Sequence, residues 1–110
     1  MGKSTHPEGT QEFPDLDALI GGYFHQDFDI YGGSLADVLS AFRKDTANDP
    51  GSAERVRADI ARFLASCRDD AQLDVEFERM FLPQVTPGGW DEGVTNWRQW
   101  LTRIAELMKV

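Results

Sequence analysis

The sequence predicts an all-α protein, a compact single-domain bundle of about five amphipathic helices. Apolar residues recur at the three- and four-residue spacing of a helical face in five separate stretches. Breakers rich in Gly and Pro separate most of these stretches. The one alternating segment, Asp27 to Tyr31, is five residues long and has no partner strand. Each apolar helix face must therefore pack against another helix.

A chain of 110 residues suits one domain, and 41% hydrophobic residues can form a core without disulfides or a structural metal. Residues 1–12 show no periodicity and contain Pro7, Gly9 and several small polar residues. They are expected to form a flexible N-terminal tail. Residues 13–110 are then expected to form the helical domain.

The first helix is predicted to begin at Pro14, because proline suits the first helical turn. Its apolar face consists of Leu16, Leu19, Ile20, Tyr23 and Phe24. The pair Gly21 and Gly22 lies within this pattern and costs helix stability. Either the helix frays at the pair or another element packs closely against it, and close packing is the expectation.

The second and third helices lie on either side of the breaker Asn48-Asp49-Pro50-Gly51. Ser34 is the predicted cap of the second helix, whose apolar face is Leu35, Val38, Leu39 and Phe42. Ser52 is predicted to open the third, whose apolar face is Val56, Ile60, Phe63, Leu64 and Cys67.

Asp69 or Asp70 is the predicted cap of the fourth helix, which Pro83 ends and whose apolar face is Leu73, Phe77, Met80 and Phe81. Val75 and Leu82 lie off that face. A loop over residues 84–93 carries Trp90. Thr95 is the predicted cap of the last helix, whose apolar residues are Trp97, Trp100, Leu101, Ile104, Leu107 and Met108.

The motifs of catalysis and metal binding are incomplete in this sequence. The glycine pairs lack the spacing and the lysine of a phosphate-binding loop. Asp27 to Gly32 resembles the start of a calcium loop, but Val38 stands where the bidentate carboxylate is needed. His25 and Cys67 would need further ligands for zinc, and nothing places them together as base and nucleophile. We expect no enzyme, no metal and no cofactor.

The net charge of -8 repels phosphate backbones, so nucleic acid is not an expected direct partner. No apolar run approaches the length of a membrane span, so no membrane association is expected. The chain has one cysteine and residues 1–12 contain no apolar leader, which together favour the cytoplasm.

The acidic residues gather in two parts of the sequence. Residues 1–33 contain six acids and one base, and residues 69–93 contain seven acids and one base. The second group supplies the candidate contacts to a basic protein partner: Asp69, Asp70, Asp74, Glu76, Glu78, Trp90, Asp91 and Glu92. The alternatives are that these acids are solvated helix faces that aid solubility, and that Trp90 folds back onto the core.

Residues 13–29 contain the run Tyr23, Phe24, His25, Gln26 and Asp27. On this run the chain resembles a family of bacterial contact-dependent growth inhibition immunity proteins, although Phe28 follows where tryptophan is more usual. The resemblance implies a small cytoplasmic protein that binds and neutralises the C-terminal toxin domain of an effector, without catalysis. Such toxins are often nucleases with basic clefts, which an acidic protein would complement.

The five-residue run itself is expected to be structural, with His25 and Asp27 hydrogen-bonding backbone groups at the end of the first helix. A direct binding role for the run is the alternative. For the whole chain, the alternative function is that of a small acidic helical adaptor or regulatory module that binds another basic protein.

Overall fold

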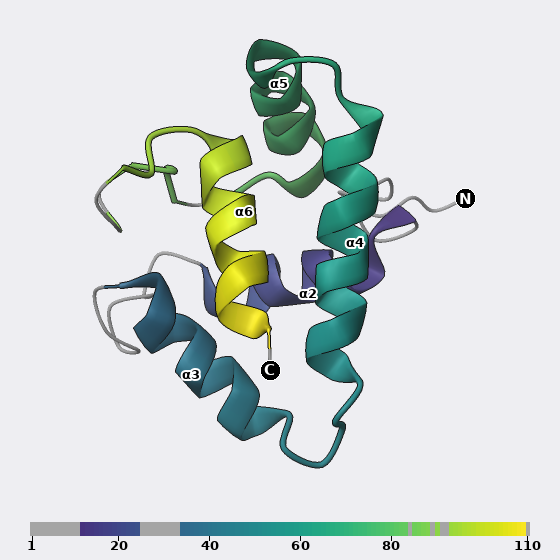
Figure 1. Cartoon of the computed structure of the whole chain (residues 1–110), viewed down its shortest axis with the longest axis vertical. Coiled ribbons are helices and arrows are strands. Elements are labelled where there is room, and N and C mark those ends of the chain that lie inside the picture. Colours follow the sequence, from purple (N-terminus) through teal and green to yellow (C-terminus); the bar gives the residue numbers. More distant parts are fainter. Residues whose placement is uncertain (1–11, 25–33, 84, 89, 91–92, 110) are drawn as a thin grey trace.

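The computed structural model describes residues 12–24, 34–83, 85–88, 90 and 93–109. With the labels of Figure 1, the helices are α2 (Pro14–Tyr23), α3 (Leu35–Asp45), α4 (Ser52–Ser66), α5 (Asp70–Phe81) and α6 (Trp97–Met108). No strand occurs within these residues. The predicted all-α bundle is therefore confirmed.

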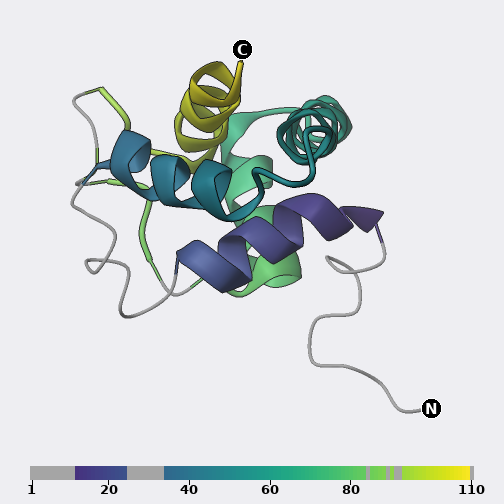
Figure 2. The same cartoon turned by 90° about the horizontal axis from the view of Figure 1, so that it is seen from below.

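α4 and α6 lie side by side, and α2 crosses behind them (Figures 1 and 2). α3 packs against α6 near the C-terminal end of α6, while α5 packs against α6 at the opposite end. α6 thus packs most extensively against three of the other helices, α3, α4 and α5. None of the helices in the described ranges is long and apolar enough to cross a membrane.

The helix ends confirm several sequence predictions. Pro14 occupies the first turn of α2. The Ser34 hydroxyl accepts a hydrogen bond from the Asp37 N–H at 3.1 Å, and the Asp69 carboxylate accepts one from the Gln72 N–H at 2.8 Å. These side chains satisfy N–H groups that have no partner within their own helices.

The predicted cap of α6 was wrong by one residue. Asn96, not Thr95, has the extended backbone of a cap, and its side-chain oxygen accepts the Gln99 N–H at 2.9 Å. The Gln99 side chain reaches back to the Thr95 N–H at 2.7 Å. Both residues are good cap formers, so the local backbone conformation decides between them.

The expected close packing at Gly21 and Gly22 was also wrong. Both glycines are exposed within α2, and a Cβ atom built on either would meet no atom of the described residues within 4 Å outside the local helix backbone. The helix continues through the pair because Leu16, Leu19 and Ile20 on its other side are buried in the core.

Backbone N–H groups in the first turn of α2 are capped by a side chain of another helix. α2 has no side-chain cap of its own; instead the N–H groups of Asp15 and Leu16 donate to the buried carboxylate of Asp59 on α4 at 2.9 and 3.0 Å. Arg62 pairs with the same carboxylate and lies 4.9 Å from the centre of the Phe13 ring. Asp59 therefore joins α2 to α4.

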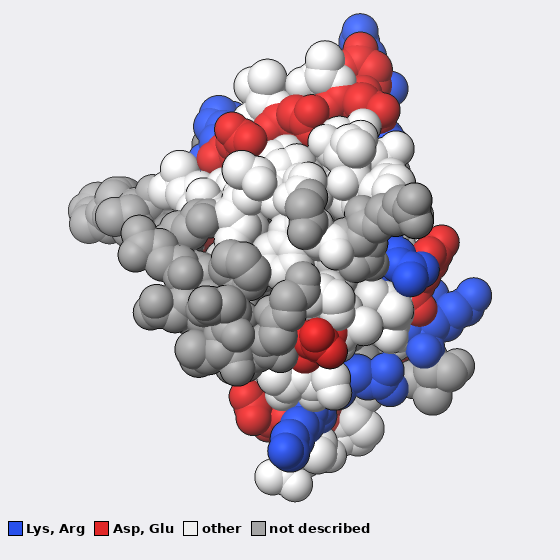
Figure 3. All heavy atoms as spheres, turned by 90° about the vertical axis from the view of Figure 1, so that its left-hand side faces the viewer, with Lys and Arg blue, Asp and Glu red and all other residues white. Residues whose placement is uncertain are grey.

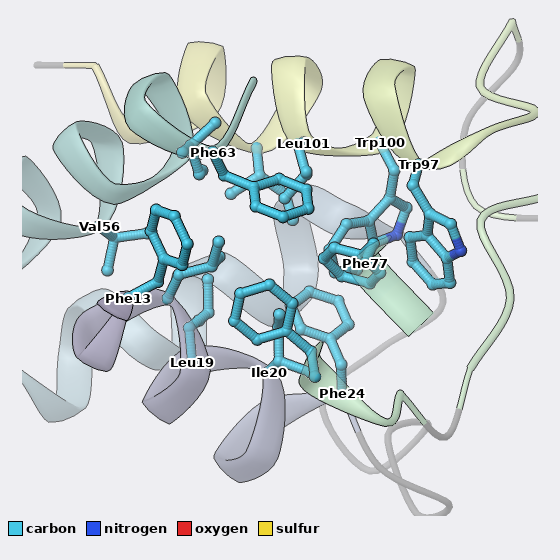
Figure 4. Close-up of a cluster of buried hydrophobic side chains, with 14 of the residues drawn as sticks. Phe13, Leu19, Ile20, Phe24, Val56, Phe63, Phe77, Trp97, Trp100 and Leu101 are labelled. Atoms are coloured by element: carbon cyan, nitrogen blue, oxygen red, sulfur yellow. The ribbon is translucent and has the colours of Figure 1, made fainter. Parts of the chain in front are cut away.

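The core is built from the predicted apolar faces and is rich in aromatic contacts (Figure 4). Phe77 stacks on Trp97 with ring centres 4.3 Å apart, and Trp100 meets Phe24 edge to face at 4.8 Å. Leu64 and Leu107 are half-buried. Cys67 is buried but follows the last turn of α4 in an extended conformation, so it lies beyond the helix.

Candidate functional site

The described acidic residues of the second group lie on α5 and at its N-cap, at one end of the bundle. Figure 3 shows acidic side chains in a band across the top of the molecule, where Figure 1 places α5. The predicted site residues that the structure describes in this region are Asp69, Asp70, Asp74, Glu76 and Glu78. The predicted site residues Asp91 and Glu92 lie outside the described residues.

Two of these carboxylates are paired with cations. Asp70 meets Arg98 on α6 at 2.5 Å, and Glu76 meets Arg79 one turn further along α5 at 2.5 Å. In each pair the positive charge compensates the carboxylate, which reduces its contribution to the long-range potential.

The other three carboxylates accept hydrogen bonds from uncharged groups and have no ion pair within the described residues. Asp69 caps α5, and Asp74 accepts the backbone N–H of Trp97 at 3.1 Å. Glu78 accepts the indole N–H of Trp97 at 3.0 Å. Asp69 and Asp74 also lie at the N-termini of α5 and α6, where the helix dipole favours a negative charge.

The contacts to Trp97 are a relationship that the sequence reasoning missed. It treated Asp74 and Glu78 as surface charges, whereas they also join α5 to the first residue of α6. Their spacing of four residues does place them on one side of a helix. Nothing in the sequence pairs them with a residue about twenty positions further on.

Trp90 belongs to a different cluster from the α5 acids. Its ring packs edge to face on Phe24 with centres 5.3 Å apart, and its indole N–H donates to the Thr86 carbonyl at 2.8 Å. The side chain is half-buried against the core. This geometry is that of a ring that covers the edge of the core and leaves part of its surface exposed.

The first two residues of the five-residue run face the bundle. The Tyr23 hydroxyl donates to Asp45 at 2.6 Å, and its ring meets Phe42 edge to face at 5.5 Å. Phe24 is 1% exposed. His25, Gln26 and Asp27 lie outside the described residues, so their structural role stays a prediction.

The described parts of the chain contain no group of three or more His, Cys, Asp or Glu side chains that could hold a metal ion. The carboxylates of the α5 surface act electrostatically on a nearby charged surface. They can attract and orient a positively charged surface.

The fold and this surface define a class: small acidic proteins built as one all-helical bundle with a charged helix at its edge. The chain belongs to the CdiI immunity protein family, whose sequence profile matches residues 12–108. The match contains all five described helices and confirms the resemblance to this family. Searches of curated proteins and of solved structures find no match. Family membership implies toxin neutralisation in a contact-dependent growth inhibition system.

Proposed function

We propose that the chain neutralises its toxin in the cytoplasm by binding the C-terminal toxin domain, a basic nuclease, with the face formed by α5 and the N-terminal end of α6. The observation that carries this proposal is a set of three carboxylates whose described partners are all uncharged: Asp69, Asp74 and Glu78. They give one face of the molecule a concentrated negative potential.

The partner chemistry follows from this potential. A nuclease must hold a phosphate backbone, so its substrate-binding surface is rich in Lys and Arg. An acidic face complements such a surface and accelerates the encounter of the two proteins. The same negative potential repels nucleic acid from the immunity protein itself. Trp90, together with Asp91 and Glu92, is the second candidate contact region.

The proposal can be tested without disturbing the hydrogen bonds of α5. The triple variant Asp69→Asn, Asp74→Asn, Glu78→Gln removes three charges but keeps a side-chain oxygen as acceptor at each position. Its association with the inactivated toxin domain encoded beside this gene should be measured by stopped flow at low and high salt. We expect association at low salt to slow about tenfold or more, with little change in dissociation.

A matched control removes three exposed carboxylates from other faces: Asp37→Asn, Glu54→Gln, Glu106→Gln. It reduces the net negative charge by the same amount but leaves the α5 face unchanged, so the association rate should stay close to that of the wild type. Equal slowing by both triple variants would show that total charge acts rather than the α5 face. A wild-type chain that does not bind the neighbouring toxin domain would refute the proposal itself.

A further inference from the structure

The outer side of α5 exposes two large apolar side chains. Val75 is 65% exposed and Leu82 is 51% exposed, whereas the other large apolar side chains in the described residues are buried or half-buried. Leu82 is the C-cap residue of α5, seven positions after Val75, so ideal helix geometry places the two residues on one side of the helix, about 10 Å apart. They lie opposite Leu73 and Phe77, which hold α5 to the core.

Leu82 also has an unusual backbone. With φ of 48° and ψ of 55°, it is the non-glycine residue in the described ranges that has a positive φ. Pro83 follows and disfavours the right-handed helical conformation at Leu82. Glycine or asparagine is the ordinary residue at such a helix end. A half-exposed leucine in this conformation adds backbone strain where glycine would not, and backbone strain of this kind clusters at functional sites.

Negative charge borders this apolar line. Glu78 lies between Val75 and Leu82 along the helix, and Asp74 lies on the same side toward α6. Figure 3 shows uncharged surface directly on both sides of the acidic band. An apolar centre with a charged rim is the usual composition of a specific protein interface.

We propose that Val75 and Leu82 are the apolar anchors of the toxin interface, and that their partner is an apolar depression rimmed by Lys and Arg on the toxin domain. This inference rests on the proposed function. The carboxylates accelerate the encounter, whereas the two apolar side chains exclude water at the centre of the contact and slow dissociation. A second copy of this chain suits the face less well, because two identical acidic rims would repel each other.

The test uses Val75→Thr, which keeps the branched shape but adds a hydroxyl, and Leu82→Gly, which removes the side chain and suits the backbone. Dissociation of the inactivated toxin domain encoded beside this gene is followed by biolayer interferometry, and melting temperatures by circular dichroism. Each substitution should raise the dissociation rate about tenfold, with association changed less than about twofold. The Leu82→Gly variant should melt at or above the wild-type temperature, a result that a merely structural leucine would not give.

Ala65→Ser, on the exposed side of α4, is the control for placing a hydroxyl elsewhere. If the wild type binds and both α5 variants dissociate at its rate, the anchor assignment is wrong while the proposed function stands. If the wild type does not bind, the proposed function fails first. A homodimer in light scattering that Val75→Thr and Leu82→Gly dissolve would assign the face to a second copy and overturn the inference.

Discussion

The Oδ2 atom of Asp59 accepts a hydrogen bond of 3.0 Å from the backbone nitrogen of Leu16, although 43 residues separate the two in the chain. The same oxygen accepts the Asp15 N–H, and Arg62 pairs with the other carboxylate oxygen. Asp59, which lies on the neighbouring α4, thus caps the N-terminus of α2. The bond draws the N-terminal end of α2 onto α4, next to the ring of Phe13.

Asp59→Ala should lower the free energy of unfolding by about 2 to 3 kcal/mol, because two backbone N–H groups lose a charged acceptor inside the bundle. Asp59→Asn should lose less, since its side-chain oxygen can still accept. Urea denaturation measures both. Glu106→Ala is the control, because this exposed carboxylate pairs with Arg103 at 3.5 Å and should contribute little. Equal effects of Asp59→Ala and Glu106→Ala would show that the α2 cap is unimportant.

Gly21→Ala and Gly22→Ala should each raise the free energy of unfolding by about 0.5 to 1 kcal/mol. Both positions are helical and exposed, with open space where the new Cβ would lie. Gly93→Ala is the matched control, since its φ of 87° disfavours any Cβ, and it should destabilise. Thermal melts compare the three variants. A loss of stability at Gly21 or Gly22 would mean that the pair serves another contact after all.

Trp90→Ala should lower stability by about 2 kcal/mol, because the ring covers Phe24 and its indole N–H is hydrogen-bonded. Toxin affinity, measured by calorimetry well below the melting temperature, separates the two roles of this residue. If Trp90→Ala weakens the free energy of toxin binding by about 2 kcal/mol or more while the melting temperature stays constant, Trp90 is an interface anchor and does not cover the core.

Acid should weaken a contact at the start of α4. Arg55 pairs with both Asp15 and Asp49, and its guanidinium holds the pKa of the Asp49 carboxyl below the ordinary value. A carboxyl with a lower pKa in the folded state stabilises the protein above its unfolded pKa and loses that contribution as pH falls through the folded pKa. The urea midpoints of wild type and Asp49→Asn should therefore converge in acid, and at neutral pH in high salt. A difference that is independent of pH would exclude this pairing.

The elements that could be predicted from sequence depend on neighbours a few residues apart. The stripe of Leu35, Val38, Leu39 and Phe42 identifies α3 because helical spacing alone places these residues on one face. Ser34 and Asp69 could be identified as caps because each bonds an N–H group three positions ahead. The same spacing argument identified Val75 and Leu82 as residues off the apolar face of α5, and both are exposed in the structure.

The sequence by itself determined the helical class, the identity of the buried faces, the acidic character of α5 and the family resemblance, because each depends on local spacing or composition. Only the tertiary structure decided which acids pair with cations and which support the bundle. Asp74 and Glu78 bond to Trp97, and Asp59 to Leu16, through groups that packing brings together from distant parts of the chain. A carboxylate has the same sequence signature whether it faces water or a helix terminus. Its role is set by the donors that the packed helices place around it.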